Sequence, residues 1–248
     1  QSNYILSTRK TLWLMSSIYL LLFIVLVLFS WIGSVYGLML PDGTLIPNML
    51  SDESMRWFVR HSMDNISAAP FAEVLLGLLM VGALRSSGFL YALWHRQQLA
   101  QRQRHGMLVS LVVMVVCVSV ILLGIVPGGN LLSVTGHISG GPFASGWPFL
   151  LMLVVVIPCI VFGKMSGQWR NSSELFAGLA SGITSYAGYF ITLVVASHLV
   201  AGIHYVRLFY LVGFSSAMQD FCIGLIYLTP LIVSFAANKL KYDTSTTE

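Results

Sequence analysis

The fold class is decided by 20-LLLFIVLVLF-29, a stretch in which no residue carries a polar side chain. It lies inside a longer apolar run, Thr11–Leu38, and a comparable stretch extends from Met107 to Gly124. Both are apolar on every side of a helix, whereas a strand of a membrane barrel alternates apolar and polar residues over about 10 positions. A helix crosses the hydrocarbon core with roughly 17–25 apolar residues. These runs therefore predict membrane-spanning helices.

The rest of the chain repeats this pattern. Of its 248 residues, 56% are hydrophobic and only 9% are charged, whereas a soluble domain has about 25% charged residues. We predict an all-α integral membrane protein, with residues 1–248 forming a single polytopic domain of six transmembrane helices. The six apolar runs are Thr11–Leu38, Pro70–Trp94, Gly106–Pro127, Gly146–Gly163, Leu175–Val200 and Leu208–Ala236.

The basic residues predict the topology. Nine of the thirteen lysines and arginines fall on one side if every run spans, and cytoplasmic loops are the ones enriched in these residues. We therefore expect both termini in the cytoplasm, with 237–248 as a cytoplasmic tail. The basic loop His95–His105 lacks interleaved aromatic residues, so we predict a topology anchor and no nucleic-acid partner. The nine are Arg9, Lys10, Arg96, Arg102, Arg104, Lys164, Arg170, Lys239 and Lys241.

The one long connection, Met39–Ala69, is predicted to lie outside the cytoplasm and to hold an amphipathic helix. Its apolar residues recur at helical spacing, a pattern typical of a helix lying in the headgroup plane. These residues are Met55, Phe58, Val59, Met63 and Ile66.

A face of small residues opens the fifth run. Gly178, Gly182, Ser185 and Gly188 permit the close approach of another helix. This face serves either internal packing or oligomerisation, and the sequence leaves both open.

The candidate polar site centres on Asp220, the one acidic residue inside an apolar run apart from Glu73, which begins the second run. A carboxylate at the bilayer centre costs about 3 kcal/mol on insertion scales and is usually paired or functional. Three roles stay open: an ion pair with Arg85, an ion or proton site, and contact with a partner protein. Ser215, Ser216 and Gln219 accompany Asp220 after a plausible helix break at Gly213.

The other potentially reactive residues do not indicate enzymatic activity. His198, near the outer end of the fifth run, is either part of a proton relay or an interfacial histidine. Cys117, Cys159 and Cys222 lie in apolar runs, as small buried hydrophobic residues do. The sequence contains no His-Glu-x-x-His, Gly-x-Ser-x-Gly, Walker or Cys-x-x-Cys motif. We expect no catalytic activity, no metal and no cofactor.

Two blocks of the chain share ordered landmarks with a known family. The first, Asn48–Gly88, carries Trp57-Phe58, Asn65, Pro70, Gly82 and Gly88. The second carries Pro142-Phe143-x-x-Gly146, Phe162-Gly163, Arg170 and Glu174-Leu175. In order and spacing this resembles the AbgT family of bacterial inner-membrane transporters, associated with p-aminobenzoyl-glutamate.

The resemblance implies a fold and a function. Family members are described as homodimers in which each subunit has a scaffold domain and a transport core with two re-entrant hairpins. The first hairpin has no counterpart here, and the family's Glu-Arg, Ala-Gln-Phe and Trp-Ser-Asn signatures fall on Arg85-Ser86, Ser197-His198-Leu199 and Tyr205-Val206-Arg207. We therefore expect a non-transporting scaffold or dimerisation subunit in the bilayer that holds partner proteins. The alternative is a minimal oligomeric transporter of a small organic anion, with its site around Asp220.

Overall fold

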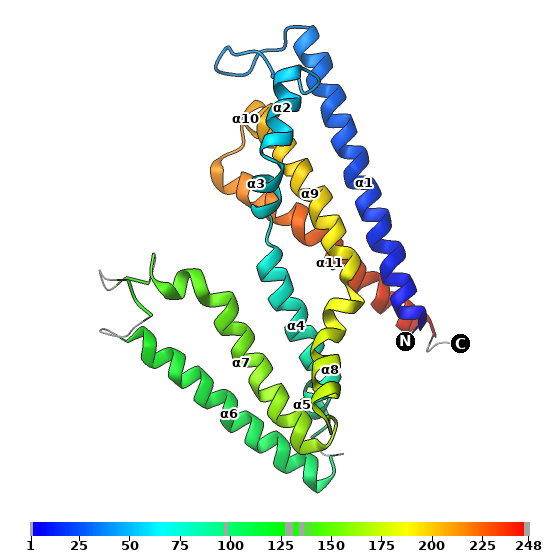
Figure 1. The fold of residues 1–248 in the computed structure, drawn as a ribbon, viewed down its shortest axis with the longest axis vertical. Coiled ribbons are helices and arrows are strands. Elements are labelled where there is room, and N and C mark those ends of the chain that lie inside the picture. The colour runs from blue at the N-terminus through cyan, green and yellow to red at the C-terminus, as the bar shows by residue number, and fades with distance from the viewer. Residues whose placement is uncertain (1, 97–98, 127–130, 134–136, 139, 246–248) are drawn as a thin grey trace. The chain divides into compact units, whose positions relative to one another are not determined.

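The computed structural model describes the backbone of residues 2–96, 99–126, 131–133, 137–138 and 140–245, and the side chains of these ranges between residues 10 and 237 (Figure 1). Apart from an isolated bridge between Met39 and Leu45, the regular structure in these ranges is helical. The helices are α1 (Ser2–Val35), α2 (Asp52–Arg60), α3 (Ser62–Ser67), α4 (Phe71–Ser87), α5 (Phe89–Trp94), α6 (Gln101–Ile125), α7 (Pro142–Ser166), α8 (Ser172–Ser185), α9 (Ala187–Val206), α10 (Leu208–Val212) and α11 (Ser216–Ser245).

The predicted membrane architecture is confirmed. Within the described ranges, six helical segments are long and apolar enough to cross a membrane. They are Lys10–Val35, Ser62–Ser87, Gln101–Ile125, Pro142–Ser166, Ala187–Val206 and Ser216–Ala237. The side of the membrane on which the termini lie stays a prediction.

Two of the expected runs are divided at positions that were not predicted. The second run was expected to continue to Trp94, but α4 ends at Ser87 because Gly88 has a φ of 72°, the left-handed conformation that commonly follows a helix. The fifth run was expected to form one helix, yet it is divided at Tyr186 between α8 and α9. Tyr186 is fully buried, and because it is neither glycine nor proline, the sequence gives no signal of a break there.

The chain forms two compact units. The first unit comprises residues 1–71 and 186–248, and the second unit comprises residues 72–185. The prediction of one polytopic domain is not tested by this division.

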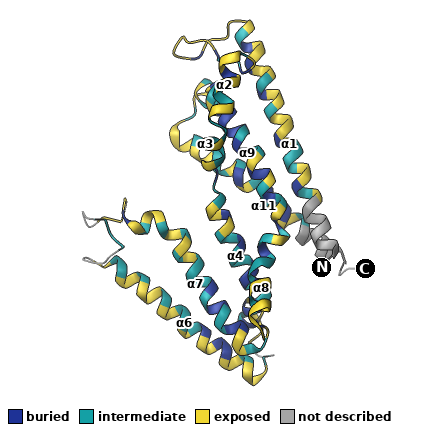
Figure 2. Ribbon diagram, in the orientation of Figure 1, coloured by how far each residue is buried: buried dark blue, intermediate teal, exposed yellow. Residues whose placement is uncertain are grey.

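Helix α9 is the centre of the first unit. Of its spanning residues 56% are buried, against 17% in α1 and 17% in α11, which pack on it (Figure 2). A Cβ built on Gly202 would lie 2.9 Å from Leu26 Cδ2, so the missing side chain lets α1 approach closely. Thr192 adds a hydrogen bond from its hydroxyl to the Leu12 carbonyl.

Two tyrosines hold α11 at its internal proline. Pro230 has no N–H, so the carbonyl four residues before it, on Ile226, loses its helical donor. Tyr19 of α1 donates its hydroxyl to this Ile226 oxygen at 2.6 Å. Tyr189 of α9 donates to the adjacent Tyr227 carbonyl. Proline is tolerated within a membrane helix when neighbouring helices supply such partners, and the first unit does so with Tyr19.

This arrangement predicts a coupling between Tyr19 and Pro230. Tyr19→Phe should lower the free energy of unfolding by about 1–2 kcal/mol, because it leaves a half-buried carbonyl without a donor. In a Pro230→Ala background residue 230 regains an N–H for that carbonyl, and Tyr19→Phe should then cost close to nothing. The cost of Tyr19→Phe in the two backgrounds is measured by a double-mutant cycle, in which the wild type, both single variants and the double variant are unfolded in bicelles. An equal cost in both backgrounds would show that Tyr19 stabilises the unit by packing alone.

The second unit contains a close crossing of α4 and α8. A Cβ built on Gly82 would lie 2.9 Å from the Gly182 nitrogen and 3.1 Å from the Gly178 oxygen. A Cβ on Gly182 would in turn collide with the Leu78 carbonyl oxygen. The two backbones are therefore in direct contact, as in membrane helix pairs built on small residues.

Trp169 fills the space beside this crossing. It is 5% exposed, and its backbone N–H donates to the Gly163 oxygen at 2.9 Å. A Cβ on Gly163 would collide with its indole ring, and a Cβ on Gly178 would lie 2.8 Å from its Nε1. Glycines on α7 and α8 thus accommodate one large aromatic side chain. The neighbouring core of this unit is Ala83, Phe89, Ala92, Met107, Val156, Cys159 and Phe162.

Candidate functional site

The candidate polar site follows an interruption between α9 and α11. Arg207 ends α9 with a φ of 57°, and Gly213 ends the short α10 with a φ of 80°. The Phe214 N–H donates to the Phe209 oxygen at 2.9 Å, which closes the turn before α11 begins at Ser216. The sequence-based expectation of a break near Gly213 matches this geometry.

The polar residues of this site gather at the start of α11. Ser215, Ser216 and Asp220 are exposed, and Gln219 is half-buried. The Gln219 side chain donates from Nε2 to the Phe214 oxygen at 3.1 Å, so it braces the turn. Asp220 makes no hydrogen bond or ion pair with the described residues. It lies four residues into α11, which places it about 6 Å from the helix start and away from the middle of the span.

Arg85 lies in the other unit. It occupies the last turn of α4, is exposed, and is engaged in an interaction there. Asp220 belongs to the first unit. An ion pair between the two therefore stays a prediction.

His198 faces a pocket of the first unit and is half-buried. Its Nδ1 lies 2.8 Å from the Val194 oxygen one turn earlier on α9. Its ring is 6.1 Å from the ring of Phe58 on α2. The structure thus places His198 in an apolar wall, apart from the polar residues around Asp220.

The residues of the small face are divided between the two units. Gly178 and Gly182 lie against α4 in the second unit, as described above. Ser185 donates to the Ser181 carbonyl of its own helix at 2.7 Å. Gly188 belongs to the first unit, where a Cβ would make ordinary contact with Leu12 at 3.6 Å.

A polar contact that the sequence-based reasoning missed joins Asp42 to Arg207. The Arg207 guanidinium donates to Asp42 Oδ2 at 2.7 Å. The Thr44 hydroxyl and backbone N–H both donate to Asp42 Oδ1. These hydrogen bonds, with that of Arg207, lower the pKa of Asp42 to about 2. The carboxylate is therefore charged at physiological pH. The sequence signal that points to this region is Pro41-Asp42-Gly43, which is a turn signature.

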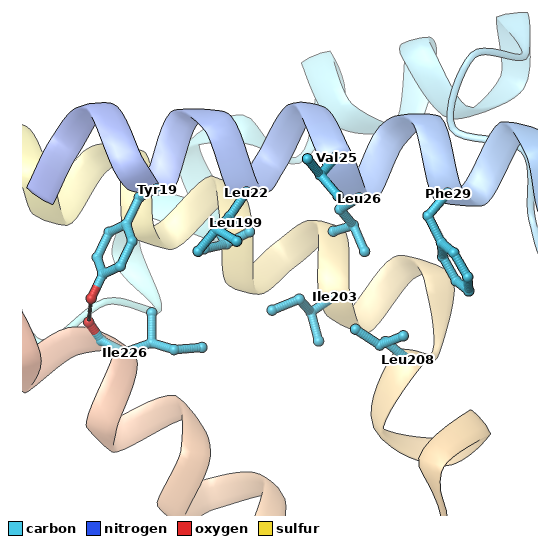
Figure 3. Close-up of a pocket in the computed structure, with 9 residues that line it drawn as sticks. All are labelled: Tyr19, Leu22, Val25, Leu26, Phe29, Leu199, Ile203, Leu208 and Ile226. Atoms are coloured by element: carbon cyan, nitrogen blue, oxygen red, sulfur yellow. Dashed lines mark hydrogen bonds between the residues drawn. The ribbon is translucent and has the colours of Figure 1, made fainter.

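A groove between α1, α9, α10 and α11 has a predominantly apolar lining (Figure 3). It has a volume of about 340 Å³. The one hydroxyl in its lining, that of Tyr19, is bound to the Ile226 carbonyl. The groove therefore suits hydrocarbon better than a polar solute. Its lining residues are Tyr19, Leu22, Val25, Leu26, Phe29, Leu199, Ile203, Leu208 and Ile226.

A sequence model described as the "AbgT putative transporter family" matches residues 93–237, more than half of the chain. The chain belongs to the AbgT family. Among solved structures, this chain is similar to MtrF of Neisseria gonorrhoeae. The structure and function of MtrF are described as illuminating "a Class of Antimetabolite Efflux Pumps". The TM-score is 0.71 at 13% identity, covering 92% of this chain and 82% of that chain. This likeness shows a shared fold. The comparison with curated proteins gives no match.

Two of the AbgT-like landmarks have structural explanations in this chain. Gly163 leaves room for the Trp169 ring, as described above. Glu174, in the first turn of α8, accepts a hydrogen bond from the Arg170 backbone N–H at 2.6 Å. A carboxylate in the first turn also interacts favourably with the positive end of the helix dipole. These landmarks of the AbgT sequence therefore position α8.

Proposed function

We propose that this AbgT-family protein moves a small organic anion across a bacterial inner membrane, as a subunit of an oligomer with both termini in the cytoplasm. The observation that carries the proposal is the exposed polar turn that joins the spanning helices α9 and α11 in a member of a transporter family. The ends of membrane helices present backbone groups that can bind a ligand. Here Ser215, Ser216 and Asp220 lie at the start of α11.

The chemistry at the start of α11 supports binding of an anion together with a cation. The first backbone N–H groups of a helix have no helical acceptor and attract negative charge. The Ser215 and Ser216 hydroxyls are exposed beside them. Asp220 would repel an anion bound there unless its carboxylate takes up a proton or a metal cation. We infer that Asp220 couples movement of the anion to movement of that cation.

The substrate class is proposed from the comparisons. MtrF is described as one of a class of antimetabolite efflux pumps. The AbgT family is associated with p-aminobenzoyl-glutamate, an organic anion. We therefore choose p-aminobenzoyl-glutamate as the test substrate.

Flux through proteoliposomes tests the proposal. Wild-type protein should move radiolabelled p-aminobenzoyl-glutamate across the bilayer when a proton or sodium gradient is imposed. Asp220→Asn should lower the initial rate at least about tenfold, equivalent to roughly 1.4 kcal/mol in the transport barrier. Asp64→Asn is the matched control, because Asp64 is an exposed carboxylate of α3, and it should leave the rate unchanged. Absence of flux in the wild type, or an unaffected Asp220→Asn variant, would refute the proposal.

A second candidate is the non-transporting scaffold that dimerises or holds partner proteins. It is favoured by the uncharged lining of the groove in Figure 3 and of a 310 Å³ pocket between α6 and α7. A scaffold should co-purify with a fixed partner at constant stoichiometry and show no flux. Crosslinking in native membranes followed by mass spectrometry separates this outcome from transport.

A further inference from the structure

A second pocket of the first unit has a different character from the groove. It lies between α1, α2, α3 and α9 and has a volume of about 490 Å³, within the roughly 300–1,000 Å³ typical of small-molecule sites. It is separate from the polar residues at the start of α11. Its lining residues are Phe23, Val27, Met49, Leu50, Met55, Phe58, Val59, Ser62 and His198.

The walls of this pocket are held in place by contacts outside it. Ser54 of α2 lies 2.6 Å from the Tyr205 hydroxyl of α9. Trp57 of α2 packs on the Tyr205 ring at 4.7 Å. Ser30 of α1 accepts a hydrogen bond from the Met49 N–H at 2.9 Å. The pocket is therefore preformed, which reduces the cost of ordering it around a ligand.

The apolar part of the pocket favours an aromatic ligand. Phe58 packs edge-on against Phe23 at 5.5 Å and lies at 31° to the His198 ring. Met49 and Met55 contribute two further polarisable side chains, and methionine sulfur makes favourable contacts with aromatic rings. None of the nine lining residues carries a fixed charge. A charged ligand would lose its hydration there without gaining a partner.

The polar part of the pocket offers hydrogen-bond acceptors. His198 Nδ1 faces the Val194 carbonyl, which can only accept, so in the neutral ring Nδ1 carries the proton and Nε2 has the lone pair. Nε2 has no partner among the described residues. Ser62 donates its proton to the Val59 carbonyl at 3.0 Å, which leaves its oxygen able to accept. A ligand that satisfies these atoms must supply a donor.

We propose that this pocket binds an uncharged aromatic molecule that carries a hydroxyl or amino group, with that group donating to His198 Nε2. An unpaired acceptor in an apolar site is costly and a donor removes the cost. A lipid acyl chain fits the apolar walls but supplies no donor. A carboxylate supplies only acceptors and a charge. The proposal does not depend on transport, because it concerns binding at a site away from Asp220.

Calorimetric titration of the full chain in nanodiscs tests the proposal, with 4-chlorophenol as the probe and 4-chlorotoluene as its isostere without a donor. Empty nanodiscs correct for partition into lipid. Wild-type protein should bind 4-chlorophenol about tenfold more tightly than 4-chlorotoluene, the discrimination expected of one hydrogen bond in an apolar site.

Variants then assign the preference to His198. His198→Phe keeps an aromatic side chain and removes the acceptor, so it should bind the two probes equally while still binding 4-chlorotoluene. If His198→Phe still binds 4-chlorotoluene, this variant is folded. His204→Phe is the matched control, because His204 lies on the same helix and outside this lining, and it should keep the tenfold preference.

A further variant locates the site independently of His198. Val27→Trp places bulk in the pocket from α1 and should weaken both probes. Equal binding of the two probes by wild-type protein would overturn the proposal and indicate an acyl-chain groove. A preference for 4-chlorophenol that survives His198→Phe would also overturn it.

Discussion

Replacing Trp169 with alanine is expected to lower the free energy of unfolding of the second unit by about 3–5 kcal/mol, the range measured when large buried aromatic residues are truncated. Trp169 is 5% exposed, and its ring contacts Gly163 of α7 and Gly178 of α8. The two glycines have no side chains that could move into the vacated volume. The cavity therefore persists, and its cost adds to the lost burial.

The comparison variant for this prediction is Trp147→Ala. Trp147 lies on α7 and is 53% exposed, so its removal should change stability by much less. Chemical unfolding of each variant in bicelles, followed by far-ultraviolet circular dichroism, measures both. Equal losses for Trp169 and Trp147 would contradict the role assigned to the indole between the glycines.

Gly82→Ala should destabilise the crossing of α4 and α8. The added methyl would lie 2.9 Å from the Gly182 nitrogen and would collide with the Leu179 carbonyl oxygen. Both neighbours are backbone atoms, so the helices must separate to make room. Overpacking of this kind costs about 1–3 kcal/mol and occasionally more.

Gly77→Ala provides the control on the same helix. A Cβ at Gly77 would meet nothing within 4 Å, and alanine has the higher helix propensity. Its stability should be unchanged or slightly raised in the same unfolding experiment. If Gly82→Ala is as well tolerated as Gly77→Ala, the close approach of the two backbones is not a source of stability.

The helical membrane fold was predictable because composition alone determines it. A stretch such as Leu20–Phe29 has no other stable form in a bilayer, and the six spans follow from the lengths of the runs. The break at Gly213 was also visible, since Gly-Phe-Ser-Ser interrupts an apolar run. The break at Tyr186 was not visible, because the residue at the division is neither glycine nor proline.

The contacts that build the sites depend on tertiary placement. Pro230 signals a missing donor, but nothing in the sequence says that Tyr19, more than two hundred residues earlier, supplies it. His198 was recognised as a candidate, whereas its pocket arises from Phe23 and Phe58 on other helices. The small-residue face was recognised as one surface, yet its glycines separate between the two units at Tyr186.

The division of the chain at residues 71 and 186 has a consequence for biogenesis. The second unit is one continuous segment, so every partner it needs has been synthesised once Ser185 leaves the ribosome. The first unit is different, because α1 packs on α9 and α11 and must wait for both. During translation, which proceeds at about 5–20 residues per second, α1 therefore remains in the membrane without its partners for the longest time. We therefore expect the second unit to complete its packing before the first.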